Sequence, residues 1–219
     1  MNERQQSLED LQHIKKMMER SSRFISLSGL SGISAGLCAL IGALVAKPYV
    51  YGQKDPIIDE TAVIILAIAK DYRIVFYSYL FWIAIATFIA AFVTAFFFTY
   101  LKSKKEETPI WSNTSMRLMI NVSIPIVVGG LFLFRMIQFE TFGLIAPGCL
   151  IFYGLALVNA SKYTLVEIRY LGFIQIALGL ISLWFVGYGL YFWAAGFGIM
   201  HILYGTYMWN KYERKESNA

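Results

Sequence analysis

The sequence predicts an all-α polytopic membrane protein: a six-helix transmembrane bundle built from three antiparallel hairpins and preceded by a short amphipathic helix. Six segments have about the 20 mostly apolar residues that a helix needs to cross a bilayer. Hydrophobic residues make up 58% of the 219 residues and charged residues only 15%, whereas about a quarter of the residues in a soluble domain are charged. Lys and Arg are also divided unevenly between alternate connections, as in multi-pass proteins.

The predicted spans form one transmembrane domain, residues 24–210. Their ranges are 24–46, 74–101, 118–137, 141–160, 168–187 and 189–209. Because the connections after the third and fifth spans are only a few residues long, these spans should fold back as tight antiparallel hairpins. A weak repeat with an offset of about fifty residues places Gly129 over Gly179 and Tyr153 near Tyr204. Apolar sequence of low complexity also produces such matches by chance. A true repeat implies hairpins that are related by rotation about the membrane normal.

Residues 1–23 precede the bundle and contain an amphipathic helix, 7–22. Ser7 can cap this helix and Asp10 has the capping-box position. Apolar residues recur three and four positions apart on one face, at Leu8, Leu11, Ile14 and Met18. Such a helix either anchors the bundle at the membrane surface or docks a soluble cytoplasmic partner or a twin subunit.

The other extramembrane segments are two loops and a short tail. The outer loop 47–73 contains a helix start at Asp55 and Pro56, so residues 56–69 should lie on the outer interface as a helix or form a lid over the bundle. The loop 102–116 is polar and is predicted to be a solvated connection. Residues 211–219 form the tail.

The basic residues predict that both termini are cytoplasmic. Fourteen of the nineteen Lys and Arg then lie inside: Arg4, Lys15, Lys16, Arg20, Arg23, Lys102, Lys104, Lys105, Arg117, Lys162, Arg169, Lys211, Arg214 and Lys215. Short cytoplasmic loops carry this excess in membrane proteins. The net charge of +5 therefore faces anionic lipid at the cytoplasmic surface and is not interpreted as a nucleic-acid site.

A row of small residues in the first span predicts close helix packing. Ser28, Gly32 and Gly36 recur at four-residue spacing, and small residues let helix backbones approach each other inside lipid. The partner is either another helix of the same chain or the same face of a second copy in a homodimer.

His201 is the one ionisable side chain predicted to lie deep in a span, which makes it the leading candidate for a ligand or proton site. Its candidate polar neighbours are Gln175, Asn121, Tyr204 and Ser182. The alternative is a neutral imidazole that is hydrogen-bonded for structural reasons.

Charged residues at the ends of spans are expected to be structural. One set, Glu167 and Arg169, lies at the start of the fifth span, and each of the two needs a separate partner because residues two apart do not face each other on a helix. The other set is Arg135, Gln138 and Glu140, where Arg135 should extend outward or pair with Glu140.

Residue patterns typical of metal, cofactor and catalytic sites are missing from the sequence. The two histidines, His13 and His201, are far apart, and there is no Cys-x-x-Cys spacing. Cys38 and Cys149 are predicted to be buried thiols, or a disulfide if their spans adjoin. Because nucleophile-elbow, phosphate-loop and dinucleotide motifs are also missing, no catalytic residue, cofactor or metal is predicted.

Two stretches, MMERSSRFISLSGLSGISAG and GYGLYFWAAGFGIMHILYGTYMWNKYER, resemble a family of small bacterial six-helix membrane proteins of uncharacterised activity. The resemblance covers most of the chain and implies a bacterial inner-membrane location. The leading expectation is a non-enzymatic binding, sensor or accessory/assembly protein. The alternative is a small transporter or channel whose polar site lies around His201.

Overall fold

The structure is a computed structural model that describes residues 28–52, 78–106 and 111–214, and the regular structure in these ranges is helical. Six helices are present in the described residues. The first five are α2 (Gly29–Tyr51), α5 (Tyr79–Lys105), α6 (Asn113–Gln138), α7 (Ile145–Ala160) and α8 (Glu167–Ser182). The sixth, called the last helix below, is continuous from 189 to 213 as α9 (Gly189–Trp193), η2 (Ala194–Met200), α10 (His201–Met208) and η3 (Trp209–Glu213).

Four of these helices are long and apolar enough to cross a membrane. They are Gly29–Tyr51, Tyr79–Lys105, Asn113–Gln138 and Phe142–Ala160, the last of which includes the 3-10 turn η1 (Phe142–Leu144). Most of their large apolar side chains point outward, as on α5, where Phe88 and Phe92 are 68% and 62% exposed. Exposed apolar surface of this extent is typical of helices that face lipid.

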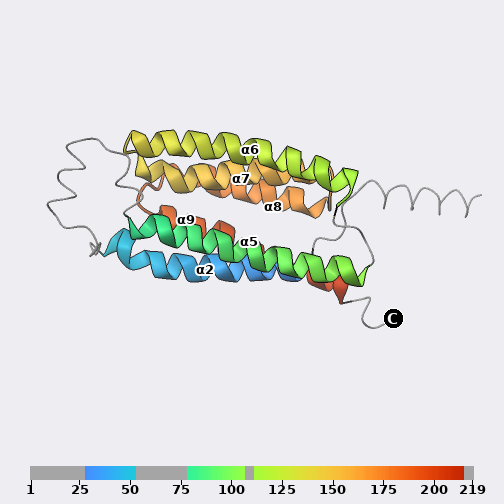
Figure 1. Cartoon of the computed structure of the whole chain (residues 1–219). Helices are drawn as coiled ribbons and strands as arrows, with labels where there is room; N and C mark the ends of the chain where they lie inside the picture. Colours follow the sequence, from blue (N-terminus) through green and yellow to red (C-terminus); the bar gives the residue numbers. More distant parts are fainter. Residues whose placement is uncertain (1–27, 53–77, 107–110, 215–219) are drawn as a thin grey trace, which may run out of the picture.

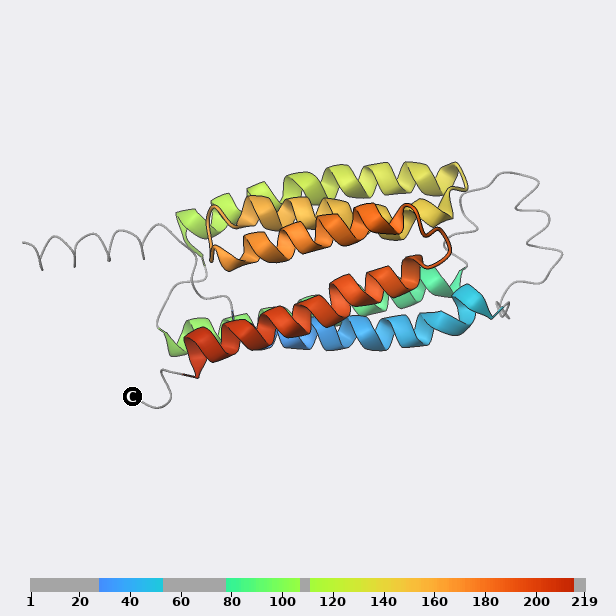
Figure 2. The ribbon, with the colours of Figure 1, turned by 180° about the vertical axis from the view of Figure 1, so that it is seen from behind.

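The helices form two groups of three, each with a central helix. In the first group, α2 lies between α5 and the last helix, and in the second group α7 lies between α6 and α8. The last helix also contacts α7 and α8, so it joins the two groups. Figures 1 and 2 show the groups from opposite sides, with neighbouring helices antiparallel. We call one end of the bundle the basic end. It is the end where α2, α6 and α8 begin and where α5, α7 and the last helix finish.

The principal neighbour of the last helix is α2 rather than α8. The turn at 183–188 connects α8 directly to the last helix, but its contacts with α8 are few beside those with α2. The tight hairpin expected for the fifth and sixth spans is therefore open. Small residues explain the preference, because α2 and the last helix both carry glycines where they meet.

The small-residue face of α2 packs inside the molecule. A Cβ added at Gly36 would lie 2.7 Å from the carbonyl oxygen of Gly198, and one at Gly32 would lie 3.1 Å from Cα of Gly205. In the other direction, a Cβ at Gly205 would lie 2.6 Å from the carbonyl oxygen of Gly29. The two backbones therefore touch, and the face packs against the last helix of the same chain.

Several helix boundaries differ from the expected ones. α2 continues through Pro48 to Tyr51, so the start of the expected outer loop 47–73 is helical. α5 continues to Lys105, so residues 102–105 of the expected solvated connection belong to a helix, and Lys102 and Ser103 are buried. α8 ends at Ser182 because the chain turns before Gly187, which has a φ of 100°. The expected helix 7–22 and segment 56–69 lie outside the described residues.

Candidate functional site

A wide turn in the last helix presents a backbone carbonyl to the space between the two groups. Residues Ala194–Met200 are π-helical, and segments of this kind often occur at functional sites. The carbonyl oxygen of Gly196 accepts from Gln175 Nε2 at 2.8 Å and bonds His201 Nδ1 at 3.0 Å. A Cβ there would lie 2.4 Å from both Gln175 Oε1 and Leu150 Cδ2, so a larger residue would displace these two buried side chains.

His201 links the last helix to α7 through a second hydrogen bond. Its Nε2 lies 2.8 Å from the hydroxyl oxygen of Tyr153. A carbonyl can only accept, so in the neutral imidazole Nδ1 carries the proton for Gly196, and Nε2 accepts from the Tyr153 hydroxyl. The 3.5 Å contact between Gln175 Nε2 and His201 Nδ1 then brings two donors together and is not a hydrogen bond. We call His201, Tyr153, Gln175 and Gly196 the histidine cluster.

Aromatic rings cover the histidine cluster along the last helix. The Phe197 ring centroid lies 6.0 Å from that of His201 and 4.9 Å from that of Tyr153. The Trp193 ring follows at 5.1 Å from Phe197. With this cover His201 is 7% exposed and Gln175 is fully buried. The cluster is a buried contact between the two groups of helices.

Two buried polar atoms beside the cluster have no hydrogen-bond partner among the described residues. They are Gln175 Oε1 and the Tyr204 hydroxyl oxygen. Leaving a buried acceptor unpaired costs about 1–3 kcal/mol, so these atoms mark the positions where the contact between the groups is least complete.

The predicted neighbours of His201 are only partly brought together. Gln175 joins the cluster. Asn121 Nδ2 instead donates to the carbonyl oxygen of Arg117 on its own helix at 2.8 Å, and the Ser182 hydroxyl donates to the carbonyl oxygen of Gly179. The Tyr204 hydroxyl has no bond to His201 among the described residues. Sequence reasoning missed Tyr153, which could have been found from its depth, because it lies near the middle of its span as His201 does.

An apolar cavity of about 790 Å³ lies between the two groups at the end opposite the basic end. Its walls come from α2, α5, the end of α6, the start of α7 and the last helix. None of the described residues that line it is charged, and Ser78 carries the only hydroxyl. The volume falls in the range of pockets that bind small molecules, about 300–1,000 Å³. No sequence pattern indicated this cavity, since its walls come from separate segments.

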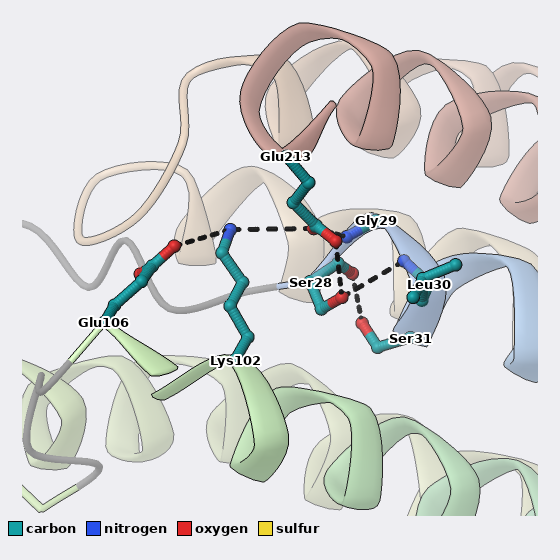
Figure 3. Close-up of polar contacts among 7 residues, drawn as sticks. All are labelled: Ser28, Gly29, Leu30, Ser31, Lys102, Glu106 and Glu213. Carbon is teal, nitrogen blue, oxygen red and sulfur yellow. Dashed lines mark hydrogen bonds and ion pairs between the residues drawn. The ribbon is translucent and has the colours of Figure 1, made fainter. Parts of the chain in front are cut away.

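A polar cluster ties α2, α5 and the last helix together at the basic end (Figure 3). Glu213 on the last helix accepts from the backbone N–H of Gly29 at 2.6 Å and from the Ser28 hydroxyl at 3.3 Å. The carboxylate thus lies at the N-terminus of α2, where the helix dipole favours negative charge. Lys102 Nζ lies 3.6 Å from both Glu213 and Glu106, and its side chain is only 8% exposed. Ser28 also caps α2 by accepting from the N–H of Leu30 at 3.2 Å.

A second ion pair joins α8 to the last helix. Glu167 accepts from Lys211 Nζ and, at 2.8 Å, from the Tyr212 hydroxyl. Burial acts to raise the pKa of the Glu167 carboxyl, but the Lys211 and Tyr212 hydrogen bonds outweigh it and hold the pKa below its usual value. The same bond raises the pKa of Lys211. Arg169 has a separate partner, Ser161 Oγ, at 3.4 Å.

The remaining predicted residues are dispersed. Arg135 donates to Gln138 at 2.5 Å and lies over the Phe139 ring, so its observed partner is Gln138 rather than Glu140. Cys38 and Cys149 are free thiols, and Cys38 Sγ lies 3.8 Å from Thr94 Oγ1. Within the described ranges, no group of three or more His, Cys, Asp or Glu could hold a metal ion.

Comparison with family models, curated proteins and solved structures gave no match.

Proposed function

We propose that this protein is a non-enzymatic membrane protein that binds a hydrocarbon chain of a membrane lipid in its apolar cavity, as a sensor or accessory protein would. The observation that carries the proposal is the 790 Å³ cavity between the two groups of helices. An apolar cavity favours an apolar occupant, because a polar one would lose its hydrogen bonds to water without replacing them.

The position of the cavity favours a lipid chain over a soluble ligand. Its walls include Leu80 and Ala84 of α5 and Ile137 of α6, and the outer faces of both helices are lined with exposed apolar side chains. In a bilayer those faces contact lipid tails. A chain can therefore enter sideways between α5 and α6 without crossing a polar surface.

The proposal places six spans in a bacterial inner membrane with both termini in the cytoplasm. Eight of the ten Lys and Arg in the described residues support this orientation, because they lie at the basic end: Lys102, Lys104, Lys105, Arg117, Lys162, Arg169, Lys211 and Arg214. Short cytoplasmic loops carry such an excess. α8 and the last helix complete the six spans, although each lacks an unbroken α-helix of 18 residues.

Transport past His201 receives less support. Transport needs a polar path through the membrane, whereas His201 is 7% exposed and does not line the apolar cavity. The histidine cluster is better explained as a fixed contact that holds the last helix against α7 and α8.

Tryptophan quenching tests the proposed lipid chain. Trp193 lines the cavity, so a variant whose other four tryptophans are Phe reports on it. In vesicles of lipids with brominated tails, Trp193 fluorescence should be quenched.

Ala84→Phe, which fills the cavity from α5, should reduce that quenching at least twofold. Ala86→Phe is the matched control, because Ala86 is an exposed alanine of the same helix that does not line the cavity. Equal quenching in both variants would refute the proposal.

A further inference from the structure

A second cavity, of about 550 Å³, opens at the basic end between α5 and the last helix. Both helices pack against α2 but not closely against each other. The cavity contains the polar cluster of Figure 3 on one side and apolar side chains on the other. It lies at the opposite end of the bundle from the apolar cavity.

Along this cavity, the lining residues of α2, α5 and the last helix change from apolar to polar in the same direction. On α5 the lining runs from Phe98 and Leu101 to Lys102 and Lys105. These positions lie on one face, because residues three, four and seven apart share a helix face. A phospholipid has the same order of groups, with apolar tails toward the membrane centre and a charged headgroup at the surface.

The other two helices repeat this order. On α2 the lining runs from Leu30 to Ser28, and on the last helix it runs from Trp209 to Arg214. Leu30 and Leu101 are 37% and 45% exposed, so the apolar wall is open toward the region that lipid tails would occupy. Trp209 lies where tryptophan is enriched in membrane proteins, at the level of the headgroups.

Three cations and two carboxylates line the cavity, so its side chains carry a net charge of about +1, and two of the cations stand outside the ion pairs. Glu106 and Glu213 both pair with the buried Lys102, and Glu213 also accepts from the backbone of α2. Lys105 and Arg214 are exposed and have no ion-pair partner among the described residues. Basic pockets between helices on the cytoplasmic side are typical binding sites for anionic headgroups.

We propose that this cavity binds one phospholipid with an anionic headgroup. Its phosphate contacts Lys105 and Arg214, and its tails lie against Leu30, Phe98 and Leu101. Lys102 pairs with the carboxylates of Glu106 and Glu213 at the base of the site and does not bind the phosphate. This inference does not depend on the apolar cavity, so either site can fail its test while the other stands.

The test compares two double variants that remove the same charge from the same end. Lys105→Gln with Arg214→Gln removes the two proposed contacts, whereas Lys104→Gln with Lys162→Gln removes two basic residues that do not line the cavity. Each protein is placed in phosphatidylcholine nanodiscs with increasing phosphatidylglycerol. Thermal stability is recorded, and native mass spectrometry counts the retained phosphatidylglycerol. All variants should melt alike in phosphatidylcholine alone, because the four side chains are at helix ends or connections.

The parent and the control should retain phosphatidylglycerol and melt at a higher temperature with it. The cavity variant should bind it up to about 30-fold more weakly than the control, since each exposed ion pair with the phosphate contributes up to about fivefold. Equal weakening in both double variants would show a general surface potential and overturn the proposal. So would the same stabilisation by soluble glycerol phosphate, which carries the phosphate without tails.

Discussion

At the scale of single residues, the bond between Tyr153 and His201 is one of the polar contacts that join the two groups of helices. Tyr153→Phe removes the hydroxyl that lies 2.8 Å from His201 Nε2 and leaves that nitrogen buried without a donor. The free energy of unfolding in mixed micelles should fall by about 1 kcal/mol, the usual size for a hydrogen bond between membrane helices.

Tyr170→Phe is the control for this prediction, because Tyr170 is 64% exposed. It should leave the free energy of unfolding unchanged. If the two variants lose the same stability, the Tyr153 hydroxyl does not hold the groups together.

The Glu167–Lys211 pair should make stability depend on acid pH. The pKa of the Glu167 carboxyl is lowered in the folded protein from its ordinary value of 4.5. Its contribution is therefore fully present above that value and is lost as the pH falls through the lower folded pKa. The raised pKa of Lys211 has its effect only at alkaline pH.

Melting temperatures measured from about pH 6 to pH 3 check this prediction. The parent should lose stability more steeply than Glu167→Gln, which has no carboxyl to protonate. Glu140→Gln, a variant of an exposed carboxylate at the opposite end, should follow the parent. A parent curve parallel to that of Glu167→Gln would be the contrary result.

At the scale of helices, the contact between α2 and the last helix should show a graded response to added methyl groups. Gly36→Ala places a Cβ 2.7 Å from a backbone oxygen that cannot move aside, and Gly32→Ala places one 3.1 Å from a backbone carbon. Overpacking of this kind costs about 1–3 kcal/mol, with the larger loss expected at Gly36.

Gly130→Ala is the matched control, because a Cβ at Gly130 meets no atom within 4 Å. It should be neutral or stabilise by up to about 1 kcal/mol, the propensity difference between Gly and Ala in a helix. Thermal unfolding in mild detergent gives the order, and equal losses at Gly36 and Gly130 would mean that the α2 face is not tightly packed.

The sequence predicted where helices occur better than it predicted which helices pack against each other. Long apolar runs reveal a helix such as α5, because crossing a membrane dictates composition. The pairing of α2 with the last helix could not be predicted from the short 183–188 turn, since it depends on glycines 160 or more residues apart, such as Gly36 and Gly198. His201 was identified from its cost in lipid. Tyr153 was not, because placing a tyrosine in a span costs little free energy, so its depth near that of His201 was the only signal in the sequence.

At the scale of the whole molecule, the distribution of basic residues predicts which end faces the cytoplasm. In a protein with Cys38 and Cys149 replaced by Ala, a single cysteine at Glu140 should react with an impermeant maleimide in intact cells. A cysteine at Lys104 should react only after permeabilisation, because it lies at the basic end. The reverse labelling pattern would invert the proposed topology.

The capping of α2 by Glu213 has a consequence for the order in which the protein is made. The Gly29 N–H and the glycine face of α2 belong to the first helix described, and their partners belong to the last. During synthesis, the contact face of the first helix therefore lacks its partner until the last helix, residues 189–213, has been translated. A ribosome that stalls before residue 189 would release a set of helices with no partner for that face, and such a product should be a preferred substrate for membrane quality control.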